Sequence, residues 1–249
     1  MEIYRARLNK EALQKIPEEE RKLFVTIAHL QNEIRFSLYG VVWSHDFTSD
    51  IEAETQGQIS INFFYLKILA GKLSEGWQLI QNYYNGNKSI AIDFNSNGSK
   101  EAISLLNELK RYFSKSNAIH NIRNSLSFHY SPDDLISQLD EAPDKLDMYI
   151  SKDNDANTLY YFAEVLSNKA ALEKLEFPAD VNPIEAIIDE LTGISKKFNK
   201  FNMLYMKYII NKYSPEIWEG TAEPIKMENL TEFSKVRIPM FTDTSNGFI

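Results

Sequence analysis

Apolar residues recur along most of the chain at the spacing of one face of an α-helix. After Pro17, three glutamates (Glu18–Glu20) precede apolar residues that keep this spacing as far as Val41 or Val42, and acidic side chains suit the positive end of a helix dipole. The same periodicity predicts helices over residues 17–43, 51–85, 100–113, 118–130, 132–139, 156–175 and 184–213. We therefore expect an all-α protein, a helical bundle of about six or seven helices.

Two segments depart from the helical pattern. Ser89–Phe94 places its large apolar residues at every second position, which predicts a short extended segment, and Asn95–Ser99 has the composition of a turn. Val236–Phe241 is a second candidate for a short strand.

The periodicity ends at Ser214, and the residues beyond it include helix-breaking prolines at 215, 224 and 239. We expect one helical domain over residues 1–213 and an irregular C-terminal tail over 214–249, packed along the bundle or against a partner subunit. Residues 1–16 form a weakly amphipathic lead-in, to which the pattern assigns no element.

Composition narrows the range of functions. The chain of 249 residues has a net charge of −8 and no cysteine, which excludes disulfides, thiolate nucleophiles and cysteine-based zinc sites. Its first residues lack the apolar core of a signal peptide and its apolar runs are too short to span a bilayer, so we expect a cytoplasmic protein without membrane contact. The acidic balance counts against a general nucleic-acid coat, which needs a broad basic face.

A small basic island stands out from this acidic background, in and just before the predicted helix over 118–130. It consists of Lys110, Arg111, Lys115, His120 and Arg123. Any contact with RNA should centre there, and Lys115 and His120 are the residues that we expect to bind RNA.

The helix that carries this island has clear boundaries. Ser116 or Asn117 can cap its start with a side-chain oxygen. The run Ser131-Pro132-Asp133-Asp134 has the cap, the first-turn proline and the acid of a new helix, so the preceding helix must stop near His129. At about 100° per residue, Ile119 and the apolar residues that follow it form one stripe, and Arg123 and His129 lie on its two edges.

An arginine and a histidine beside a packed stripe suit an anionic phosphate. Guanidinium binds phosphate oxygens in a fork, and imidazole can transfer a proton near neutral pH. A purely structural alternative remains open, in which Arg123 pairs with a carboxylate and His129 meets the negative end of the helix dipole.

The string IRNSLSFHY (residues 122–130) resembles the signature of the HEPN superfamily. In that signature an arginine, usually followed by a polar residue, precedes a histidine by four to six residues within a helical bundle. Arg123-Asn124, the five residues between Arg123 and His129, and the aromatic residues on either side of His129 match it.

The resemblance implies a metal-independent endoribonuclease, without a cofactor, that acts as a homodimer and leaves a 2′,3′-cyclic phosphate. Carried over, His129 would be the general base or acid, Arg123 would stabilise charge on the phosphoryl group, and Asn124 would orient the histidine or the phosphate. It also implies a role in defence or toxin–antitoxin systems, with an antitoxin as a partner. The alternative is a non-catalytic helical scaffold that binds RNA or protein.

Three other arrangements carry weaker signals. His29 and Glu33 share a helix face, but one histidine and one acid do not make a metal site, and we expect none. Ser125 lies one turn before His129 without the glycine elbow of a serine hydrolase. The basic and aromatic run Lys196–Phe201 could stack on single-stranded nucleic acid, but a bundle helix with a solvated lysine edge explains it better.

Overall fold

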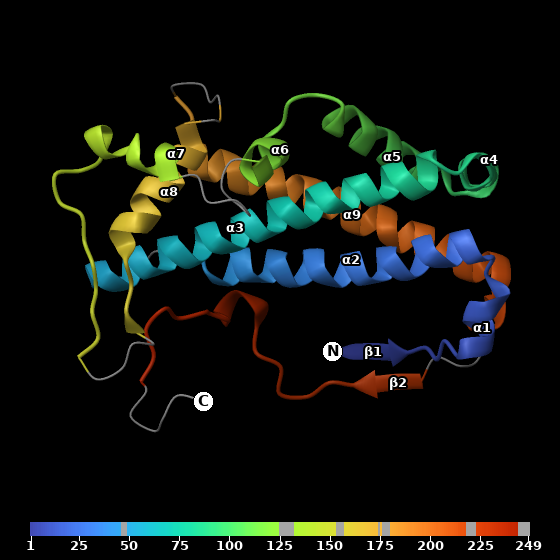
Figure 1. Cartoon of the computed structure of the whole chain (residues 1–249). Helices are drawn as coiled ribbons and strands as arrows, with labels where there is room; N and C mark the ends of the chain where they lie inside the picture. The colour runs from blue at the N-terminus through green and yellow to red at the C-terminus, as the bar shows by residue number, and fades with distance from the viewer. Residues whose placement is uncertain are drawn as a thin grey trace. The chain divides into compact units, whose positions relative to one another are not determined.

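The computed structural model describes residues 1–45, 49–124, 132–152, 157–173, 175, 180–217 and 223–243. Over these residues the protein is predominantly α-helical, with a single small sheet of two strands (Figure 1). The predicted all-α class is therefore confirmed. The described residues form nine α-helices, more than the expected six or seven. One additional helix (Lys10–Lys15) lies in the lead-in, to which no element was assigned, and the other (Lys88–Asn97) lies where an extended segment and a turn were predicted.

The long periodic segments became the long helices, close to their predicted bounds. These are α2 (Glu18–Trp43), α3 (Glu52–Ile80), α5 (Lys100–Phe113), α8 (Tyr161–Glu173) and α9 (Pro183–Tyr213). The shorter elements are β1 (Glu2–Arg5), α1 (Lys10–Lys15), α4 (Lys88–Asn97), α6 (Ala118–Ile122), α7 (Pro132–Ile136) and β2 (Glu223–Lys226). A π-helical turn, η1 (Gln81–Asn85), continues α3.

Contacts divide the chain into two units. The first unit contains the described residues of 1–35, 72–115 and 193–235, and the second contains those of 36–71, 116–192 and 236–249. The boundaries fall inside α2, α3 and α9, so each of these helices contributes one part to each unit.

The predicted strand over Ser89–Phe94 is wrong, because these residues lie in α4. Ile90 and Phe94 are 4% and 0% exposed, whereas Ile92 between them is 66% exposed. Only a helix places residues four apart on one face and turns the residue between them outward, since a strand would put all three on the same face. The Asn87 side chain starts this helix by accepting hydrogen bonds from the backbone N–H groups of residues 89 and 90.

Phe94 is the centre of an aromatic cluster in the first unit. Its ring centroid lies 5.2 Å from that of Tyr208 and 5.3 Å from that of Tyr205, both on α9, and 5.8 Å from that of Tyr84. The contacts with Tyr84 and Tyr208 are edge-to-face, the arrangement that the charge distribution of aromatic rings favours. This cluster fixes α4 against α9.

The only sheet among the described residues joins two segments that are far apart in the sequence. β1 and β2 are antiparallel, with Glu2 opposite Lys226 and Arg5 opposite Glu223 (Figure 1). Arg5 and Glu223 also form an ion pair. The strand predicted at Val236–Phe241 is wrong: this segment has no strand, and the carbonyl of Ile238 accepts a hydrogen bond from the Gln58 side chain at 2.9 Å.

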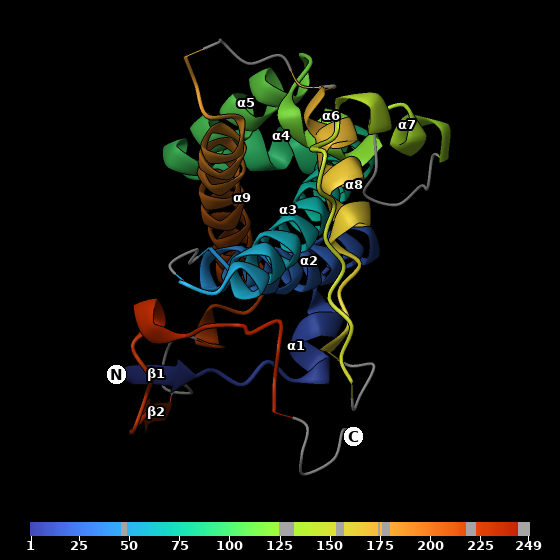
Figure 2. The ribbon, with the colours of Figure 1, turned by 90° about the vertical axis from the view of Figure 1, so that its left-hand side faces the viewer.

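In the second unit, α3 caps the end of α2. The buried Asn62 side chain donates to the carbonyl of Val41 at 2.8 Å and to the hydroxyl of Ser44 at 3.1 Å. The last carbonyl groups of a helix lack partners within it, so this asparagine satisfies one of them. Elsewhere in the unit, α7 packs against α8 (Figure 2).

The Phe94 cluster predicts a large effect of truncating this ring. We expect Phe94→Ala to lower the free energy of unfolding by about 3–5 kcal/mol, because it removes a fully buried ring and leaves a cavity. The measurement is urea unfolding followed by circular dichroism. Phe64→Ala is the control, since Phe64 is 56% exposed, and it should cost less than about 1 kcal/mol. Equal losses in the two variants would contradict this account of the core.

Candidate functional site

The helix of the Arg–His motif begins as its sequence indicates. The Asn117 side chain accepts a hydrogen bond from the N–H of His120 at 2.9 Å, which makes Asn117 the N-cap of α6. Ile119 and Ile122 are buried, as the predicted apolar stripe requires. The first N–H of the helix, that of Ala118, donates to Glu190 Oε1 on α9 at 3.2 Å. This contact and the buried isoleucines fix α6 within the second unit.

Three of the predicted site residues form a chain of hydrogen bonds at the end of α6. Arg123 Nη1 donates to Asn124 Oδ1 at 3.0 Å, and Asn124 Nδ2 lies 2.7 Å from His120 Nε2. Because the amide oxygen accepts from arginine, the amide nitrogen faces His120 as a donor. Asn124 therefore joins the guanidinium of Arg123 to the imidazole of His120.

This arrangement can bind an anion at the surface. His120 and Asn124 are exposed and Arg123 is partly exposed, so a ligand can reach all three side chains. A guanidinium provides several N–H donors in a plane, which is the geometry that suits the oxygens of a phosphate.

The structure says less about the remaining predicted residues, His129 and Lys115. His129, with Ser125 and Tyr130, lies outside the described residues, so its predicted catalytic role stays a prediction. Lys115 belongs to the first unit, whereas His120, Arg123 and Asn124 belong to the second. Their shared contact with RNA also stays a prediction.

The pairing of Asn124 with His120 is a contact that the sequence reasoning missed. These residues are four apart on one helix, a spacing that places side chains side by side. The signal was therefore present, but the predicted partners of Asn124 were only His129 and the phosphate.

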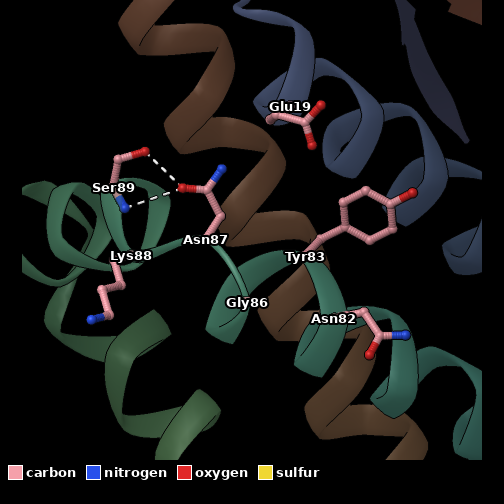
Figure 3. Close-up of a pocket in the computed structure, with 7 residues that line it drawn as sticks. All are labelled: Glu19, Asn82, Tyr83, Gly86, Asn87, Lys88 and Ser89. Atoms are coloured by element: carbon pink, nitrogen blue, oxygen red, sulfur yellow. Dashed lines mark hydrogen bonds between the residues drawn. The ribbon is translucent and has the colours of Figure 1, made fainter.

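A hollow of about 560 Å³ lies in the first unit where η1 meets α4. Figure 3 shows that Asn87 points toward Ser89, which donates to Asn87 Oδ1 from both its backbone N–H, at 3.1 Å, and its hydroxyl, at 2.7 Å. The Lys88 side chain points away from Glu19. Since the donors at the start of α4 are occupied and the charged groups do not converge, this hollow is a weaker candidate site than the end of α6.

Two further arrangements that the sequence suggested have structural roles. Glu33 accepts from Lys72 at 2.5 Å and lies 3.6 Å from His29, and no group of three or more histidine or acidic side chains within the described ranges could hold a metal ion. Phe198 and Phe201 are buried, so their rings cannot stack on nucleic-acid bases.

Among the described residues, no helix is long and apolar enough to cross a membrane.

Comparison of the chain with known protein families, with curated proteins and with solved structures found no match. Only the residues of this chain therefore indicate its function.

A charged network surrounds Lys212 in the first unit, at the edge of the Phe94 cluster. Lys212 Nζ lies 2.6 Å from Asp93 Oδ2 and 3.2 Å from Glu20 Oε2, which joins α9 to α4 and α2. Tyr208 donates to Asp93, and Tyr213 donates to Glu20 at 2.9 Å. Burial alone would raise the pKa of Asp93, but hydrogen bonds from Lys212 and Tyr208 hold that pKa below its usual value. We call this network of Lys212, Asp93 and Glu20 the clamp, because its ion pairs join α9 to α4 and α2.

The clamp predicts a loss of stability that depends on pH. We expect Lys212→Met to lower the free energy of unfolding by about 1–3 kcal/mol at pH 7, because Asp93 and Glu20 then share a site without their cation. The lowered pKa of Asp93 means that its contribution is present above its unfolded-state pKa and is lost as the pH falls through the folded-state pKa. Urea unfolding at pH 7 and at about pH 3 measures both effects.

The control for this variant is Lys22→Met, which removes an exposed lysine paired with Glu18 and Glu19. Exposed pairs contribute little, so this change should cost less than about 1 kcal/mol. A loss in Lys212→Met that stayed the same at both pH values would show that the ion pairs are not its cause.

Proposed function

We propose that this chain is a HEPN-like endoribonuclease that cleaves RNA without a metal ion. The observation that supports the proposal is the hydrogen-bonded group of Arg123, Asn124 and His120 on an exposed helix end. It brings a phosphate-binding cation and a polar orienting residue together within an all-α protein, as the resemblance implies. The cluster lies in the second unit.

The proposed reaction is an internal transfer at phosphorus. His129 of one protomer removes the proton from the ribose 2′-OH, whose oxygen attacks the neighbouring phosphorus. The bond to the 5′-oxygen breaks, and the leaving oxygen takes a proton from the second His129 of the dimer. The products are a 2′,3′-cyclic phosphate and a free 5′-hydroxyl, so no outside reactant is consumed.

Arg123 and Asn124 have distinct parts in this step. The Arg123 guanidinium neutralises the negative charge that grows on the phosphoryl oxygens in the transition state. Asn124, which accepts from Arg123 and donates to His120, holds the guanidinium in place before RNA binds. His120 and Lys115 each contact the RNA backbone.

A homodimer accounts for the spacing of the motif. Arg123 and His129 are six positions apart in the sequence, and along a helix this is a rise of about 9 Å. A site made from both protomers would pair the arginine of one with the histidine of the other across that gap. We place such an enzyme in defence or toxin–antitoxin systems of the cytoplasm, where an antitoxin would restrain it.

The test is RNA cleavage by the purified protein in EDTA. We expect His129→Ala and Arg123→Ala each to lower the cleavage rate by a factor of about 10²–10⁴, the usual contribution of a proton-transfer or charge-stabilising group. The measurement is gel analysis of a labelled RNA, with the cyclic phosphate identified by mass. His29→Ala is the control, because His29 is an exposed histidine on α2.

Two results would reject the enzyme. One is the absence of cleavage with RNA that the protein binds, which would favour the alternative of a non-catalytic RNA-binding or protein-interaction scaffold, consistent with the net charge of −8. The other is equal cleavage by the wild type and His129→Ala, which would point to a contaminating nuclease.

A further inference from the structure

An open groove runs along the C-terminal half of α9 in the first unit. Its volume is about 1,170 Å³. The floor is formed by α9, one wall by Gln31 and Arg35 of α2, and another by Glu101 of α5. All of these residues belong to the same unit.

The floor of the groove is apolar. It consists of Met203, Leu204, Met206 and Ile210, of which Met203 is 49% exposed and the others are partly exposed. Met203, Met206 and Ile210 fall within about 60° of one another on the helix, so they form one stripe. From Met203 to Ile210 this stripe is about 10 Å long. Methionine side chains adapt readily to the shape of a partner, which makes such a stripe suited to binding.

The rims of the groove are basic. Arg35 on α2 and Lys207 on α9 have no ion-pair partner within the described part of the chain, and Lys200 is 3.4 Å from Glu101. The protein as a whole has 35 acidic and 27 basic residues. In a chain with an excess of acids, two unpaired cations beside an apolar stripe show that the groove is complementary to an acidic ligand.

We propose that this groove binds an acidic amphipathic α-helix of a partner protein. A helix fits because the stripe is straight, is as long as about two helical turns and has cations on two separate elements. Such a partner would place apolar side chains on the methionines and acidic side chains toward Arg35 and Lys207. A fatty acid has one charge at one end and would leave one of the rims unmatched.

The inference goes beyond the proposed nuclease and does not depend on it, since the groove contains none of the residues assigned to RNA cleavage. The probe is a synthetic peptide of about 16 residues with leucines at i, i+3, i+7 and i+10 and glutamates on both sides of that stripe. Fluorescence anisotropy of the labelled peptide measures binding to the full chain. We expect a dissociation constant in the micromolar range that rises with salt.

Two groove variants test the contacts. Met203→Glu places a negative charge on the apolar floor, and the double variant Arg35→Glu with Lys207→Glu reverses the rims. Each should weaken binding at least tenfold. The matched control is Lys10→Glu with Lys88→Glu, which changes the net charge equally at exposed lysines on α1 and α4. It should stay within about twofold of the wild type, since neither lysine lines the groove. Circular dichroism verifies that every variant is folded.

Several outcomes would overturn the proposal. One is no binding of the peptide at millimolar concentration, and another is equal binding of a peptide with lysines in place of its glutamates. A third is stronger binding to phosphatidylglycerol vesicles than to the peptide through the same residues, which would assign the groove to a membrane surface. His129→Ala should bind the peptide as the wild type does, so a failure of the nuclease hypothesis leaves this test intact.

Discussion

The first unit depends on the burial of one aromatic ring. Phe94 meets Tyr205 and Tyr208 of α9 from a helix over residues 88–97. Only a helix buries Phe94 together with Ile90 and leaves Ile92 exposed between them. The hydrophobic gain from that face outweighs the strand preference of its β-branched residues. Asp93, the neighbour of Phe94 in the chain, then points to Lys212, so the same helix that fills the core also completes the ion pairs at its edge.

The sequence predicted what depends on local pattern and missed what depends on distant partners. The long helices and the Asn117 cap follow from periodicity and capping chemistry, and the structure has them within a few residues of their expected bounds. The extended segment at Ser89–Phe94 was wrong because alternation over so few residues also fits a helix face. β1 could not be predicted, since its four residues are all exposed and its partner lies more than 200 residues away.

The candidate sites show the same difference between what local sequence predicts and what only the structure reveals. Arg123 and Asn124 could be proposed from the string that contains them, whereas the hydrogen bond from Asn124 to His120 required the side-chain directions at the end of α6. The groove on α9 left no sequence signal, because its walls come from α2 and α5. The two surfaces also differ chemically. The end of α6 offers directed donors for an oxyanion, while the groove offers contact area with positive charge only at its rims, as protein partners require.

Because of the π-helical turn η1, the structure depends on the number of residues between α3 and α4. Its defining hydrogen bond runs from the N–H of Gly86 back to the carbonyl of Gln81, at 3.1 Å, which accommodates one more residue than an ordinary turn. Any side chain at position 86 would collide with the carbonyl of Asn82. A single-codon deletion here would rotate all that follows by about 100°. Natural variation in this protein should therefore preserve the residue count at this junction more strictly than the identity of its exposed residues.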